Sequence, residues 1–224
     1  MSDQLIFDLP CYPALGFNDF FVSKANKLAF DLVKNWAHWS NDRLLVMGAK
    51  GSGKTHLSNV WANLTNATFE NVIELDFNLQ NINAIVLENI ELAASRLDLE
   101  ERLLHILNHC SSNRIPVLLT SNDFSSRAGF ELKDLNSRLI ATEHISIEQP
   151  DDALISAVLI KQFNDRQIQI SPSLIEFILK RITRSMASIG SFVEELDRTV
   201  LKLGKSANRA IISEVLDKFS QNEA

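Results

Sequence analysis

The sequence is poor in the residues that mark disulfide-rich and membrane proteins. It has only 2 cysteines in 224 residues, Cys11 and Cys110, too few for a disulfide framework. No apolar run approaches the roughly 20 residues that a membrane-spanning helix needs, and the start MSDQLIFDLP lacks the basic residues of a secretory signal. We therefore expect a cytoplasmic protein with free thiols and no contact with membranes.

Basic residues are also in the minority. The 22 Lys and Arg residues are outnumbered by 28 Asp and Glu residues, which gives a formal net charge of −6. Proteins that coat nucleic acid neutralise phosphates with clustered Lys and Arg, so the composition argues against that class. The 46% apolar content is enough for one domain of moderate size and a smaller one, each with its own core.

Glycine is scarce as well, yet three of the 7 glycines lie in the stretch GAKGSGKT, Gly48 to Thr55. This stretch matches the phosphate-loop pattern G-x-x-x-x-G-K-[ST]. It follows the apolar run Leu44 to Met47 and precedes a helix-like run from His56 to Leu64. An ordinary glycine-rich turn is the alternative, but the order of strand, loop and helix favours a phosphate site.

The chemistry of a phosphate loop assigns a role to each part of this stretch. Glycines let the backbone N–H groups converge on a polyphosphate, and the N-terminus of the following helix adds partial positive charge. Lys54 would reach the β- and γ-phosphates, and the Thr55 hydroxyl would hold Mg²⁺. The expected nucleotide contacts are Gly48, Gly51, Ser52, Gly53, Lys54, Thr55 and His56.

Strand-like and helix-like runs alternate as far as residue 149, which predicts a parallel sheet with helices on both faces. We expect strands at 44–47, 72–75, 84–87, 116–120 and 144–147. From Pro150 onward the pattern is helical, and we expect helices at 151–165, 171–181, 186–203 and 207–220. The predicted organisation is a tail (1–15), an α/β domain (16–149) and a helical domain (150–224).

Two strand ends carry polar residues where ligands of open α/β sheets lie. Glu88 follows the apolar strand Ala84 to Leu87 and would complete the Mg²⁺ shell, unless it belongs to a polar turn. Asn89 stands where many ATPases of this plan have a second carboxylate; an amide orients water but cannot take its proton, so we expect weak hydrolysis. Asn122 would sense the γ-phosphate, or form a turn.

Two further features have a functional and a structural interpretation. Arg138, in the helical segment LNSRL, would either complete a neighbouring subunit's nucleotide site or be a solvated surface residue. The tail segment Gln4 to Leu9 has a polar residue followed by the apolar anchors Leu5, Phe7 and Leu9. Such a segment suits docking into a partner's groove, or packing on the chain's own core as an edge strand.

Taken together, these motifs resemble those of the AAA+ ATPases, and among them the Hda-type, DnaA-related regulators of replication. The resemblance covers nearly the whole chain: DFFVSKANKLA is similar to the adenine-site segment, GAKGSGKTHL to Walker A, IVLENIE to Walker B, LLTSN to sensor 1 and LNSRL to the arginine-finger box. It implies an AAA+ P-loop fold with a parallel five-stranded sheet flanked by helices, a smaller all-helical lid, and ADP or ATP with Mg²⁺ as ligands.

The resemblance also implies partners. The segment QLIFDL at Gln4 to Leu9 is similar to the motif that binds the sliding clamp, the DNA polymerase III beta subunit. The implied function is to stimulate ATP hydrolysis by DnaA through Arg138, with DNA reached only through the clamp and self-association as a further expectation. The sequence ends after the lid-like helices, so we expect no helix-turn-helix DNA-binding domain.

Two positions depart from the family pattern. Walker B has Asn89 where a second carboxylate is expected, and the sensor 2 arginine should fall near Ala187 or Ser188, where neither residue is basic. Arg184 is the nearest substitute and is our candidate for that contact. The alternative function is a nucleotide-gated adaptor that binds DnaA or another replication protein without stimulating hydrolysis; a small-molecule kinase would leave the helical block and the tail without a role.

Overall fold

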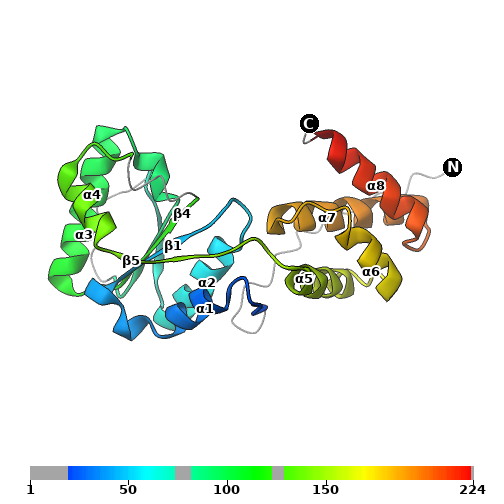
Figure 1. Ribbon diagram of the computed structural model, residues 1–224, viewed down its shortest axis with the longest axis horizontal. Coiled ribbons are helices and arrows are strands. Elements are labelled where there is room, and N and C mark those ends of the chain that lie inside the picture. Colours follow the sequence, from blue (N-terminus) through cyan, green and yellow to red (C-terminus); the bar gives the residue numbers. More distant parts are fainter. Residues whose placement is uncertain (1–19, 74–81, 123–128, 223–224) are drawn as a thin grey trace. The chain divides into compact units, whose positions relative to one another are not determined.

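The computed structural model describes residues 20–73, 82–122 and 129–222, and these form two compact units (Figure 1). One unit covers the described residues up to Gln149, and the other begins at Pro150. Each is described by itself below.

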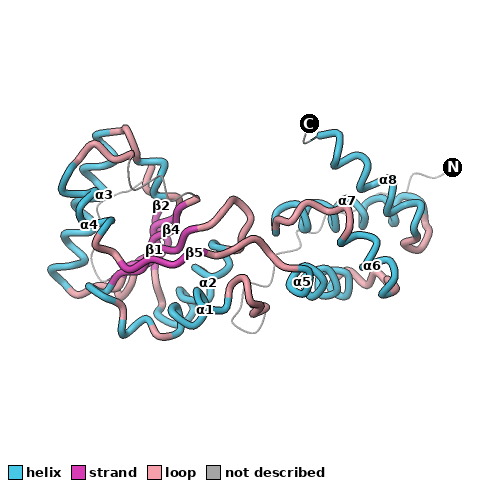
Figure 2. The backbone as a smooth tube through the Cα atoms, in the orientation of Figure 1, coloured by secondary structure: helices cyan, strands magenta, loops and turns pink. Residues whose placement is uncertain are grey.

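The first unit is built on a parallel sheet (Figure 2). Its five strands lie in the order β2-β3-β4-β1-β5, and every neighbouring pair is parallel. The strands are β1 (Arg43–Met47), β2 (Thr68–Asn71), β3 (Ile85–Glu88), β4 (Val117–Ser121) and β5 (Glu143–Ser146). This confirms the predicted five-stranded parallel sheet. The inner strands read as continuous apolar runs because helices cover both of their faces.

Alternate residues of β1 explain how the two faces are covered. Leu44 and Val46 face a core formed with α1 (Lys27–Lys34) and α2 (Lys54–Thr65). Leu45 and Met47 face a second core formed with α3 (Leu97–Asn113) and α4 (Lys133–Ile140). The strand period of two thus sends alternate side chains to opposite faces of the sheet. Figure 1 shows α1 and α2 on one side of the strands and α3 and α4 on the other. Short 3₁₀ helices η2 (Trp36–His38), η3 (Ser40–Asp42) and η4 (Ile90–Ala93) join these elements.

The strand predicted at 72–75 is wrong. The edge strand is β2, Thr68–Asn71, and Val72 and Ile73 form a turn after it, while 74 and 75 lie outside the described residues. Three of the four β2 residues are exposed, so this strand has no apolar run to mark it. The Asn71 side chain accepts the Ile73 N–H at 3.0 Å, which closes the turn.

The described residues from Pro150 onward form four helices, in agreement with the predicted helical block. They are α5 (Asp152–Asp165), α6 (Pro172–Leu179), α7 (Met186–Leu203) and α8 (Arg209–Asn222). The capping residues are chemically ordinary: Asp151 accepts the Leu154 N–H at 2.8 Å, and Gly204 ends α7 with φ of 60°. Phe163 and Phe192 are fully buried between the helices. In the part of the chain that is described, no helix is long and apolar enough to span a membrane.

Candidate functional site

The loop between β1 and α2 needs glycine at three positions. Gly51 and Gly53 have φ of 78° and 102°, in the region that side chains rarely adopt. Gly48 is limited by space instead, because a Cβ there would lie 2.6 Å from Ser52 Oγ and 2.9 Å from the carbonyl oxygen of Ile147. The Gly48 N–H donates to the Ser121 carbonyl at 3.2 Å, which fixes the start of the loop beside β4.

Lys54, the first residue of α2, is buried in this loop with 7% of its surface exposed. Its Nζ donates to the carbonyl oxygens of Gly48 at 2.7 Å and Ala49 at 3.1 Å, and to Asn122 Oδ1 at 2.9 Å. Burial lowers the pKa of Lys54, and the carboxylates of Glu91 and Glu88 act in the opposite direction. The ammonium group is therefore held where the loop would receive a phosphate.

Asn122 extends this contact to a residue that the sequence did not single out. Its Nδ2 donates to Glu91 Oε1, so Glu91 and Lys54 occupy the two ends of one amide group. Glu91 lies in η4, directly after the Glu88-Asn89 turn. The sequence did contain a signal for Glu91, because it lies three residues after Glu88 in IVLENIE. In a 3₁₀ turn, side chains three residues apart lie on the same side.

Asn89 has a clear backbone role. It adopts the left-handed conformation, with φ of 56° and ψ of 49°, and its N–H donates to Thr120 Oγ1 at 3.0 Å. Asn is among the few residues that tolerate this conformation, so it suits the turn from β3 into η4. Its role in orienting water stays a prediction.

The residues around the loop fit a polyphosphate with Mg²⁺. Within the described residues, no side-chain cap is seen at the start of α2, whose N-cap residue is Gly53. The first N–H groups of α2 are therefore available to a phosphate in the loop. Glu88 Oε1 and Glu91 Oε2 are buried and have no hydrogen-bond partner in the described part of the chain. Such carboxylate oxygens and the hydroxyl of Thr55 are ligands that Mg²⁺ prefers.

The predicted adenine-site segment lies beside His56. The Phe20 and His56 rings meet edge to face with centroids 5.0 Å apart, and Phe20 stacks on Phe30 at 5.2 Å. Asn26 shapes the segment, since its Nδ2 donates to the Phe21 carbonyl oxygen at 2.8 Å. The structure thus brings His56 and this segment together next to α2.

Arg138 lies away from the loop. It belongs to α4, and only two residues separate the end of α4 from β5, which begins beside Leu44 near the start of β1. Burial lowers the pKa of Arg43, the first residue of β1, and the charge of Arg138 lowers that pKa further. The loop follows the other end of this strand, roughly 13 Å away at about 3.3 Å per residue. Arg138 is therefore too far from its own chain's phosphate loop to contact a phosphate bound there.

The remaining candidates lie elsewhere. Arg184 belongs to the helical unit, where its Nη2 lies 2.8 Å from Asp152 Oδ1, and its contact with nucleotide stays a prediction. The proposed clamp contacts Gln4, Leu5, Phe7 and Leu9 lie outside the described residues.

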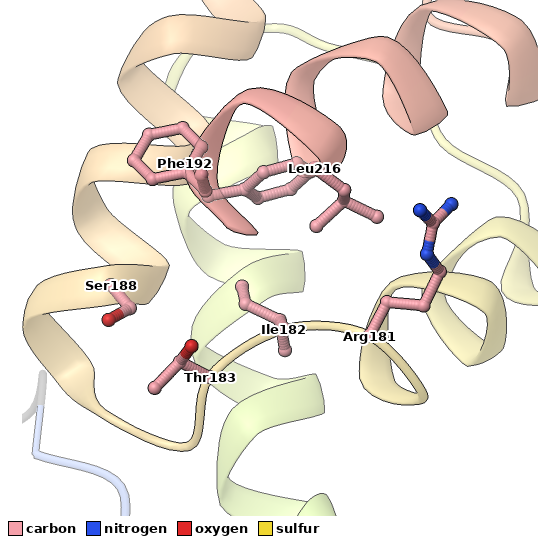
Figure 3. Close-up of a pocket in the computed structure, with 7 residues that line it drawn as sticks. Arg181, Ile182, Thr183, Ser188, Phe192 and Leu216 are labelled. Atoms are coloured by element: carbon pink, nitrogen blue, oxygen red, sulfur yellow. The ribbon is translucent and has the colours of Figure 1, made fainter. Parts of the chain in front are cut away.

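A cavity of about 20 Å³ lies in the helical unit, between the segment after α6 and helices α7 and α8 (Figure 3). Its lining includes Thr183, Ser188, Phe192 and Leu216. A volume of this size holds about one water molecule, which is too small for a nucleotide.

Comparison with known proteins gives the fold a context. No protein-family model matches the chain. Among curated proteins, the chromosomal replication initiator protein DnaA of Buchnera aphidicola is 25% identical over 202 residues, covering 77% of this chain and 44% of that protein. DnaA of Chlorobaculum tepidum is 22% identical over 228 residues, 88% of this chain and 44% of that protein. The chain therefore spans less than half of these initiators. An uncharacterised Haemophilus influenzae protein is 24% identical over 212 residues, 88% of this chain and 91% of that protein.

Solved structures agree with this relationship. Domain III of Thermotoga maritima DnaA superposes with a TM-score of 0.79 at 15% identity, covering 94% of this chain and 99% of that chain. AMPPCP-bound DnaA from Aquifex aeolicus gives a TM-score of 0.68 at 16% identity, covering 83% and 65%. The Thermotoga maritima RuvB Holliday junction branch migration motor gives 0.69 at 15%, covering 90% and 71%. The chain has the AAA+ fold of DnaA and RuvB, which confirms the predicted fold class.

Proposed function

We propose that this chain, an AAA+ protein related to DnaA, is a regulator that binds ADP or ATP with Mg²⁺ and stimulates ATP hydrolysis by DnaA while held on the sliding clamp. The observation that carries the proposal is the placement of Arg138 at the opposite end of β1 from the phosphate loop. An arginine finger in that place acts on a partner's nucleotide, since it is too far from its own.

Nucleotide binding is supported by the phosphate loop and by the fold. Two DnaA structures with the same fold contain AMPPCP, an ATP analogue. In this chain Lys54 and the N–H groups at the start of α2 would hold the phosphates, and Thr55 and Glu88 would hold the metal ion, which neutralises phosphate charge. The Phe20–His56 contact lies beside the segment proposed to line the adenine site.

Weak turnover by the chain itself follows from Asn89. The amide cannot accept a proton from water, and its backbone is tied to Thr120 in a turn. In this proposal the nucleotide stays bound and shapes the surface that a partner recognises.

The action on DnaA depends on the Arg138 guanidinium. It lies 3.3 Å from Asp134 Oδ1 on the same helix, and the Asp134 side chain is 61% exposed. Arg138 is half-buried but Asp134 is well solvated, so this ion pair contributes on the order of 1 kcal/mol, and a transferring phosphoryl group would displace Asp134 readily. Arginine contacts to such groups stabilise the charge that develops during transfer.

The same ion pair supports the adaptor as a second candidate. If Arg138 keeps Asp134 as its partner in the complex, the chain would bind DnaA or another replication protein without stimulating hydrolysis. The two candidates differ in one readout, which is the rate at which bound ATP becomes ADP in the partner.

The experiment mixes the purified chain with DNA-loaded clamp and DnaA carrying labelled ATP. We expect conversion to ADP that Arg138→Ala abolishes. Arg198→Ala is the matched control, because Arg198 likewise pairs with a carboxylate four residues away on its own helix, Glu194, at 2.9 Å. Equal conversion by wild type and Arg138→Ala would overturn the assignment of Arg138, and no conversion with stable binding would favour the adaptor.

A further inference from the structure

Glu100 is a fully buried carboxylate that joins two distant segments. It lies in α3 and has 0% of its surface exposed. Its Oε1 accepts the N–H of Ser95 at 3.0 Å and of Glu131 at 3.1 Å, and its Oε2 accepts the N–H of Leu132 at 2.8 Å. Both oxygens are therefore used, by backbone groups more than 30 residues apart in the chain.

These bonds are strong enough to define local structure. A buried carboxylate is costly unless hydrogen bonds replace its water, and bonds to charged acceptors are about twice as strong as neutral ones. Removing the carboxylate would leave three partly buried N–H groups without this acceptor. The backbone at Glu131 and Leu132 is thus held against α3.

One of the two segments is the start of α4, the helix of Arg138. Leu132 directly precedes α4 as its N-cap residue, and its own apolar side chain makes no capping hydrogen bond. The Glu100 carboxylate supplies an acceptor and a negative charge at the N-terminus of α4, where both are favourable. Leu135 and Leu139 then pack into the α3 core along the helix. Glu100 fixes where α4 begins, and the leucines fix its rotation.

The other segment, at Ser95, follows an element that contacts the phosphate-loop lysine through Asn122. Ser95 follows η4 and has φ of 60°, so its backbone is held in an unusual conformation where it meets Glu100. η4 carries Glu91, the acceptor of the Asn122 amide that also binds Lys54. One carboxylate therefore links the element beside the nucleotide site to the helix that carries the finger.

We propose that Glu100 is a positioning residue for Arg138: by binding the backbone at Ser95, Glu131 and Leu132, it holds α4 where the guanidinium reaches a partner's phosphate. This inference rests on the proposed function of Arg138. A purely structural role would make Glu100 variants less stable, without a specific loss of stimulation in folded protein.

The test uses Glu100→Gln, which keeps the volume of the side chain. One acceptor becomes an NH₂ donor, which opposes one of the backbone N–H groups. We expect nucleotide affinity to stay within about twofold of wild type, as the phosphate loop is unchanged. Stimulation of hydrolysis in saturating partner should fall on the order of 10- to 100-fold, the cost of a small displacement of a catalytic group. Hydrogen exchange at the Glu131 and Leu132 amides should become faster.

Two further variants make the test specific. Glu101→Gln is the matched control, since Glu101 is the next residue of α3 and is exposed, and it should behave as wild type. Leu132→Pro removes the N–H donor from the other side of the contact, and the Leu132 φ of −73° suits proline. It should lower stimulation in the same direction as Glu100→Gln, and it decides the question if Glu100→Gln does not fold.

The outcomes separate this inference from the proposed function. Full stimulation by folded Glu100→Gln, or by Leu132→Pro if the former is unfolded, would overturn the positioning role. If wild type itself gives no stimulation, the proposed function fails. The contact of Glu100 with the start of α4 is then tested by hydrogen exchange alone. Unchanged exchange at Glu131 and Leu132 in the variant would then overturn it.

Discussion

Lys54 and Asn122 are 68 residues apart in sequence, yet Lys54 Nζ donates to Asn122 Oδ1 at 2.9 Å. They meet because β1 and β4 are parallel neighbours whose carboxyl ends share one edge of the sheet. A phosphate bound by the loop would compete with Asn122 and with the loop carbonyls for the same ammonium group. If the chain binds nucleotide as proposed, this contact would rearrange.

The lysine contact gives the first prediction. Lys54→Ala should weaken binding of ADP and ATP by about 10- to 100-fold, because hydrogen bonds to charged groups contribute about 1.5–3 kcal/mol. Titration with a fluorescent adenine nucleotide measures the affinity. Lys50→Ala is the control, since Lys50 is an exposed lysine of the same loop and should bind as wild type does. Equal loss in both variants would contradict the assignment of Lys54.

The packing at Gly48 gives the second prediction. In Gly48→Ala the new Cβ would meet Ser52 Oγ and the Ile147 carbonyl, so we expect a loss of about 1–3 kcal/mol in the free energy of unfolding. Gly190→Ala is the matched control: nothing lies within 4 Å of its added Cβ, and in helix α7 alanine should stabilise by up to about 1 kcal/mol. Urea denaturation measures both. A neutral effect at Gly48 would show that the loop relaxes freely.

The elements around this site were predictable from sequence where the local pattern of apolar and capping residues was clear. β1 and β4 were predicted because both faces of each strand are buried and the apolar runs are continuous. α7 was predicted with both ends as observed. In the structure, Ser185 caps its start by accepting the Ser188 N–H, and Gly204 ends it in the left-handed conformation. β2 was misplaced because its exposed residues carry no apolar pattern.

Other features depend on tertiary structure. Glu100 and Glu101 are adjacent acidic residues of one helix, and sequence offers no reason to treat them differently, yet one is fully buried and the other exposed. Their difference comes from tertiary structure, because the Glu131 N–H, 31 residues further along, donates to Glu100. Likewise, the Glu91–Asn122 contact exists because β3 and β4 are neighbours in the sheet.

Cys110 gives a prediction on pH. Burial raises the pKa of this thiol from its ordinary value of 9.0 to about 11. The unfolded state loses the proton at lower pH than the folded state, so the free energy of unfolding should fall between about pH 9 and 11, by at most about 1.4 kcal/mol per unit. Denaturation across this range measures the slope. Cys110→Ala should show a shallower slope, and identical slopes would contradict the assignment.

The tail gives a fourth prediction. Gln4→Ala should weaken binding to the sliding clamp by about tenfold or more, as expected for loss of one well-placed anchor contact. Surface plasmon resonance with immobilised clamp measures the affinity, and Ser2→Ala is the control within the same tail. Clamp binding that ignores Gln4→Ala, or its absence in wild type, would rule out this docking segment.

The central claim is that the chain acts on a partner's nucleotide through Arg138. It is tested most directly by single-turnover hydrolysis, with labelled ATP bound to DnaA and unlabelled nucleotide bound to this chain, on DNA-loaded clamp. The account predicts that labelled phosphate is released with wild type and with Arg198→Ala, and that Arg138→Ala gives the rate of DnaA alone. Equal release with Arg138→Ala, or rapid hydrolysis by this chain in the absence of DnaA, would contradict it.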